Sequence, residues 1–146
     1  MYNKENHLQR LSIIIERQSN FSMKFYILLF SLVSFTIPIY TFAFESGMFK
    51  NTCQTILISI FSFLVVNTVS IVFFYNSYKY LKMERCFIIL QSKVNNGKIN
   101  EENYDWKKFS KEEEVNKKTF VFWSSLIAMI LIATISIILP IIQIFI

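Results

Sequence analysis

Three long stretches of this chain carry no charged residue, and they constrain its fold more than any other feature. They hold 20, 28 and 28 residues, and their apolar runs lie at residues 25–44, 55–75 and 119–145. A helix needs about 20 apolar residues to cross the ~30 Å hydrocarbon core of a bilayer. A chain of 146 residues is too short to bury three such helices inside a soluble domain. We therefore predict an all-α protein with three transmembrane helices, organised as a single membrane domain.

The composition favours long helices. Gly and Pro occur only twice each, so the chain has few residues that favour tight turns. Charged residues make up 17% of the chain, below the quarter or so that is usual in soluble domains. No stretch has the short apolar core and small cleavage-site residues of a signal peptide, so we expect the first span to be retained.

Lys and Arg are distributed unequally between the two predicted sides of the membrane. The segment 1–24 carries 4 of them, the loop 76–118 carries 10, and the loop between the first two spans carries only Lys50. Cytoplasmic loops of membrane proteins are enriched in Lys and Arg. This bias predicts that the N-terminus and the loop 76–118 are cytoplasmic and that the C-terminus is external. The basicity of the chain is thus a topology signal, and we expect no nucleic-acid site.

The cytoplasmic segments are predicted to be helical. Residues 5–20 read as an amphipathic helix with Leu8, Leu11 and Ile15 on one face, ending near Ser19 or Asn20. This helix would lie on the inner leaflet or pack on the cytoplasmic loop. Further along, a short helix is predicted at residues 104–109, and the third span is predicted to begin in the cytoplasm near Lys111.

The second span is predicted to continue into the cytoplasm as one helix of about 40 residues, ending at Gly97. Beyond Tyr75, apolar side chains recur at alternating spacings of three and four, as in a coiled-coil seam. The seam residues are Tyr80, Met83, Phe87, Leu90 and Val94. The stripe needs a cover, which the N-terminal helix, residues 104–109 or a second copy of the chain could provide. We expect self-association of the chain through this stripe.

Residue types that carry chemistry are scarce. The chain has one histidine, His7, and two glycines, so it offers neither a catalytic triad nor a glycine-rich phosphate loop. Cys53 and Cys86 fall on opposite predicted sides of the membrane and lack metal-ligand spacing. The spans contain no ionisable residue, which argues against a pump or coupled transporter but leaves open a pore lined by hydroxyls and amides. We expect no enzymatic activity and no cofactor.

Asn67 is the most polar side chain near the middle of a predicted span. An unpaired amide is costly in hydrocarbon, so Asn67 should hydrogen-bond to another helix. Three arrangements satisfy it: a packing contact within the chain, a contact with Asn67 of a neighbouring copy, or a place in a pore lining.

Two segments, one just before the first predicted span and one just after the second, match sequence patterns that recur in a family of proteins. Residues 7–24 follow the pattern HLxxIQxVIxRMAxNSFxxK, with the part from Arg17 to Lys24 shortened, and residues 80–94 follow the end of LDAYYLxxERLFRxLYxxV. The patterns are those of a family of small bacterial inner-membrane proteins of undefined activity, which this chain resembles over about 40 residues. The resemblance implies a helical protein of this topology in the bacterial inner membrane. Ser77 replaces the family's aspartate, so no role of that acid carries over.

The two matching segments would meet on the cytoplasmic side, where an ion pair of Arg17 with Glu84, or of Glu16 with Arg85, is predicted. Alternatively, Arg17 and Arg85 only anchor at lipid headgroups. By analogy with membrane-acting effectors of bacterial defence loci, we hypothesise an oligomeric, pore-type protein that perturbs the membrane. The second hypothesis is a membrane anchor that docks a cytoplasmic protein partner through residues 75–118.

Overall fold

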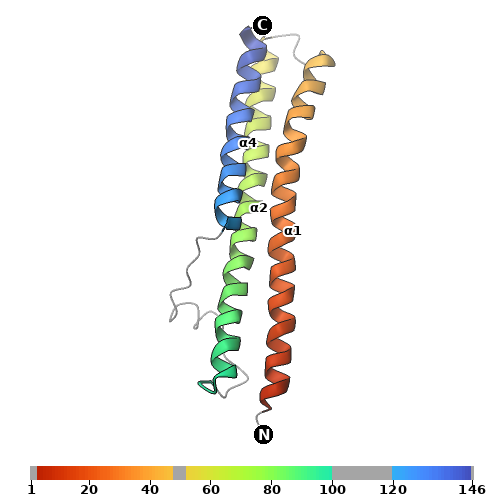
Figure 1. Ribbon diagram of the computed structural model, residues 1–146. Helices are drawn as coiled ribbons and strands as arrows, with labels where there is room; N and C mark the ends of the chain where they lie inside the picture. Colours follow the sequence, from red (N-terminus) through yellow and green to blue (C-terminus); the bar gives the residue numbers. More distant parts are fainter. Residues whose placement is uncertain (1–2, 48–51, 100–119, 146) are drawn as a thin grey trace. The chain divides into compact units, whose positions relative to one another are not determined.

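The computed structural model describes residues 3–47, 52–99 and 120–145, and nearly all of these residues are helical. Helix α1 comprises Lys4–Glu45, α2 comprises Thr52–Asn95 and α4 comprises Phe120–Phe145 (Figure 1). All three are long and apolar enough to cross a membrane. The prediction of a helical protein with three candidate spans is therefore confirmed for the described residues. The helix predicted at 104–109 and the start of the third span near Lys111 lie outside them.

Local chemistry explains where the helices begin and end. The side-chain oxygen of Asn3 accepts a hydrogen bond from the Asn6 amide at 3.2 Å, which caps the start of α1. At the end of α2, the amide of Gly97 donates to Val94 at 3.1 Å and that of Lys98 donates to Lys93 at 2.9 Å. This is a Schellman motif, and it requires the positive φ of 71° that Gly97 adopts. Helix α2 ends at Asn95, and the prediction that Gly97 is its left-handed cap is confirmed.

Helix α1 differs from the prediction in one respect. A break was expected near Ser19 or Asn20, but α1 continues without interruption through both residues and through Pro38. Ser and Asn lower helix propensity only modestly, so neither ends a helix by itself, and the residues on both sides of Asn20 are helical. The amphipathic segment and the first apolar run are consequently parts of one 42-residue helix.

The chain divides into two compact units. We call Met1–Lys24 with Asn76–Lys118 the polar unit, and Phe25–Tyr75 with Thr119–Ile146 the apolar unit. The division points coincide with the borders of the three apolar runs. Helices α1 and α2 are each divided between the two units, with one segment in the polar unit and one in the apolar unit.

The apolar unit has a small core and an apolar exterior. Leu29, Ala128 and Ile132 are buried, and Leu32, Val66 and Phe73 are among the half-buried side chains packed around them. Large side chains such as those of Phe42 and Phe61 expose 67% and 69% of their surface. Soluble proteins rarely expose contiguous apolar surface on this scale, and lipid is the solvent that suits it.

Candidate functional site

A row of polar side chains lies between α2 and α4 in the apolar unit. The amide nitrogen of Asn67 donates to its own helix at the Phe63 carbonyl, 2.8 Å away, and to the Ser136 hydroxyl across the helix pair at 3.4 Å. Ser136 in turn donates to the Ile132 carbonyl. The structure thus gives Asn67 a partner on another helix of the same chain, the first of the three arrangements left open by the sequence.

Further buried serines lie on the same two helices. Ser70 and Ser125 expose 1% and 2% of their surface, and the Ser70 hydroxyl donates to the Asn67 carbonyl at 2.8 Å. Within the part of the chain that the structure describes, the buried hydroxyls of Ser59 and Ser125 have no hydrogen-bond partner. An unpaired hydroxyl in an apolar environment is unfavourable by a few kcal/mol, roughly 1–3. Ser59, which lines one groove together with Ser136, is therefore where the row is chemically incomplete.

Ser59 faces a groove on the apolar unit. The groove measures about 380 Å³ and runs along α2 and α4. Ser59 and Ser136 provide its polar lining, and the other lining residues are apolar: Ile60, Phe63, Leu64, Ile137 and Ile141. A groove with this lining fits an apolar helix or an acyl chain that carries at most a small polar group.

Helices α1 and α2 make a separate polar contact within the apolar unit. The Tyr40 and Ser62 hydroxyls lie 2.8 Å apart, and both line a cavity of about 120 Å³. Most of the other hydroxyls on the outside of this unit bond back to their own helix, as Thr68 does to the Leu64 carbonyl at 2.7 Å. Such bonds hide the hydroxyl from lipid. Among the described residues, the polar groups that join two helices of this unit or line its groove are therefore the ones considered for recognition of another molecule.

In the polar unit, α1 covers the apolar stripe of α2. Leu11 of α1 is buried against Cys86, Leu90 and Val94 of α2, with Leu8, Phe87, Ile89 and Ile99 packed around them. The Tyr80 ring stacks on Phe21 of α1 at a centroid distance of 5.2 Å, and Met83 is half-buried. One chain thus supplies a cover for the stripe, so the stripe no longer argues for a second copy. Self-association stays a prediction.

The buried face of α2 is rotated slightly from the predicted seam. Leu90 and Val94 are fully buried as seam residues should be, but Cys86 and Leu81 are also buried, at 1% and 8% exposure. Phe87 lies at the edge of the core. The predicted seam left out Cys86 because it counted only large apolar side chains. Unpaired cysteine is among the most frequently buried residue types, and this signal would have identified Cys86.

A second feature that the sequence analysis missed is a close crossing of two serines. The Ser22 hydroxyl donates to the Ser77 carbonyl at 3.2 Å, and the Ser77 hydroxyl donates to the Ser22 carbonyl at 3.3 Å. Both residues are buried. Small side chains let the two backbones approach, and each hydroxyl is satisfied by the partner helix. In this chain, Ser77 is therefore a packing residue.

The predicted ion pairs involve residues at the surface of the polar unit. Glu16, Arg17 and Arg85 are exposed and Glu84 is half-buried. The guanidinium carbon of Arg17 lies over the Phe21 ring, 5.7 Å from its centroid. Pairing of Arg17 with Glu84, or of Glu16 with Arg85, stays a prediction.

No protein-family model, curated protein or solved structure matches this chain. The function proposed below is therefore inferred from the contacts and grooves of the residues described above.

Proposed function

We propose that this chain is a non-enzymatic protein of the bacterial inner membrane that self-associates and perturbs the bilayer as a pore-type effector, of the kind found in antiphage defence loci. The observation that carries the proposal is the row of uncharged polar groups at the contact of α2 and α4, which ends at a groove lined by Ser59. Hydroxyls and amides can line a water-filled path without the ionisable groups that coupled transport needs.

Self-association would complete the polar row. An apolar helix of a second copy could occupy the groove and offer a hydrogen-bond partner to Ser59. Polar contacts between helices contribute about 0.6–2 kcal/mol each in a membrane, so a few of them together with close packing are enough to select one arrangement of copies. The orientation proposed with this function places the N-terminus and the polar unit in the cytoplasm, because 14 of the 15 Lys and Arg residues lie there.

The test is membrane potential in cells that express the chain. Expression should depolarise the cells, and Ser59→Leu should reduce this at least several-fold, because the larger side chain fills the groove and leaves the bond between Asn67 and Ser136 in place. Thr68→Leu is the matched control, since Thr68 is exposed on the same helix and lies outside the groove. Equal amounts of each variant in the membrane fraction must be established by blotting.

Asn67→Leu adds a second comparison. This substitution removes the amide that bonds to Ser136 in the polar row, so it should weaken depolarisation as well. Cells that keep a normal potential under strong expression, with and without the genes adjacent to this one, would contradict the pore-type proposal.

One observation favours a second candidate function, that of a membrane anchor for a cytoplasmic protein. Residues of α1 and α2 form a compact polar unit with its own core, separate from the apolar unit. A unit of this kind can present a defined surface to a partner through residues 75–118. Normal potential together with a partner that co-purifies with wild type but not with Arg85→Glu, which reverses an exposed charge of the polar unit, would support this alternative.

A further inference from the structure

Three cations surround one pair of stacked rings in the polar unit. The rings of Phe21 and Tyr80 stack at 5.2 Å with an interplanar angle of 28°. The charged groups of Arg17 and Lys24 each lie 5.7 Å from the Phe21 centroid, and the Lys79 ammonium lies 6.0 Å from that of Tyr80. Attraction between a cation and the face of a ring holds each charge near the pair.

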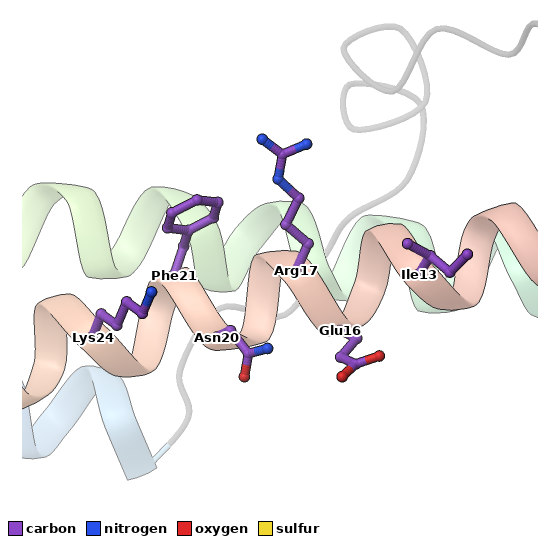
Figure 2. Close-up of a pocket in the computed structure, with 6 residues that line it drawn as sticks. All are labelled: Ile13, Glu16, Arg17, Asn20, Phe21 and Lys24. Carbon is purple, nitrogen blue, oxygen red and sulfur yellow. The ribbon is translucent and has the colours of Figure 1, made fainter.

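Arg17, Phe21 and Lys24, which belong to this cluster, also line a groove of about 300 Å³ on α1. Figure 2 shows Arg17 and Phe21 on one side of the helix, with the Lys24 ammonium turned toward the Phe21 ring, whereas Glu16 and Asn20 point to the other side. The residues that line the groove are Ile13, Glu16, Arg17, Asn20, Phe21 and Lys24. The lining thus holds two cations and one carboxylate, and the carboxylate points away from the cations.

This arrangement suits a phosphate group. Like charges gathered around one ring pair repel one another, and an anion placed among them removes the repulsion. A guanidinium presents parallel N–H donors that match two oxygens of a phosphate, and an ammonium adds a compact positive charge. Arg17, Phe21 and Lys24 follow one another at spacings of four and three, so they share one face of α1.

We propose that this groove binds the phosphate headgroup of an anionic phospholipid. A lipid is favoured over a free phosphate because Lys24 directly precedes Phe25, the first residue of an uncharged stretch of 20, and Lys79 follows soon after the second apolar run. Basic residues at the ends of spans lie at the level of the headgroups, where each contributes about 1 kcal/mol to the attraction of anionic lipid. The inference does not depend on the proposed pore-type function.

The experiment titrates the purified full-length protein in mild detergent with phosphatidylglycerol or with phosphatidylcholine, and counts bound lipids by native mass spectrometry. The double variant Arg17→Gln/Lys24→Gln should bind phosphatidylglycerol about 10- to 30-fold more weakly, with phosphatidylcholine binding unchanged. The matched control is Lys93→Gln/Lys98→Gln, which removes the same charge about five helical turns beyond Tyr75. The control should bind like wild type.

Three results would overturn the proposal. They are equal binding of both lipids by wild type, equal loss in the control variant, and displacement of phosphatidylglycerol by millimolar inorganic phosphate, which would identify a free phosphate as the ligand. The charge-preserving variant Arg17→Lys/Lys24→Arg should retain the preference for phosphatidylglycerol. Phe21→Leu, which keeps every charge and removes the ring that holds two of them, should lose part of it. Circular dichroism checks that each variant keeps its helices.

Discussion

Serine takes the place of glycine at the helix contacts of this protein. Ser22 and Ser77 are buried where α1 meets α2 in the polar unit, and Ser125 and Ser136 are buried on α4 in the apolar unit. The chain has only two glycines, and both lie outside the helices at positive φ. A serine is small enough for close helix approach, and its hydroxyl can bond to a backbone carbonyl, so it fits both in water and in lipid.

Substitution of Ser77 tests this role of serine. Ser77→Leu adds two heavy atoms and removes a hydroxyl where two serines bond to the carbonyls of each other's helices, so it should destabilise the polar unit by about 1–3 kcal/mol. Ser92→Leu is the control, because Ser92 is exposed on the same helix and should change stability by less than about 0.5 kcal/mol. Thermal unfolding in detergent, followed by circular dichroism, measures both. Equal stability of the two variants would show that the crossing is not closely packed.

At the scale of elements, the apolar runs predicted the helices well because lipid imposes a simple rule of length and composition. All three runs fall on helices, and α2 ends at Asn95, just before Gly97, whose positive φ closes the helix cap. The break expected at Ser19 or Asn20 was wrong because tertiary packing holds a helix together through residues of weak propensity.

The rotation of the seam has a related cause. Hydrophobic periodicity weighs side chains by their apolarity, whereas a two-helix contact also selects side chains that are small. Ser77 and Cys86 are buried at 1% exposure each, and neither stands out as hydrophobic in the sequence. The partners of Asn67 were equally beyond periodicity, since which serine faces an amide depends on how α2 and α4 pack in three dimensions.

A pair of substitutions on α2 tests the packing of the polar unit. Leu90 exposes 2% of its surface and Ile88, two residues earlier, exposes 39%. Leu90→Asp buries a charge in the core with Leu11 and should destabilise the polar unit by roughly 2–4 kcal/mol, whereas Ile88→Asp should cost less than about 1 kcal/mol. Hydrogen exchange of residues 4–24 and 76–95 measures the effect. Similar exchange in both variants would mean that α1 does not cover this face of α2.

At the scale of the whole molecule, charge and burial follow the same division. The apolar unit contains only two charged residues, Glu45 and Lys50, and the polar unit contains the other 14 Lys and Arg residues. The polar unit has an apolar core and a charged surface, as a water-soluble helical pair does, and the apolar unit exposes large apolar side chains. The polar unit has the surface that water favours and the apolar unit has the surface that lipid favours, so two different solvents explain the contrast between the two units.

The two cysteines allow the proposed orientation to be tested with the native sequence. Cys53 is an exposed thiol near the start of α2 and Cys86 is buried in the core of the polar unit. If the N-terminus is cytoplasmic, Cys53 lies on the external side. A membrane-impermeant maleimide should then label wild type in intact spheroplasts, and Cys53→Ser should abolish that labelling, whereas Cys86→Ser should leave it unchanged.

Reporter fusions provide an independent measurement: a fusion at Lys98 should be active as a cytoplasmic reporter and one after Ile146 as an external reporter. The Lys and Arg bias of 14 to 1 makes the inverted arrangement unfavourable, because it would require the basic loop 76–118 to cross the membrane. Labelling of Cys53 only after lysis, together with a cytoplasmic signal from the fusion after Ile146, would contradict this topology.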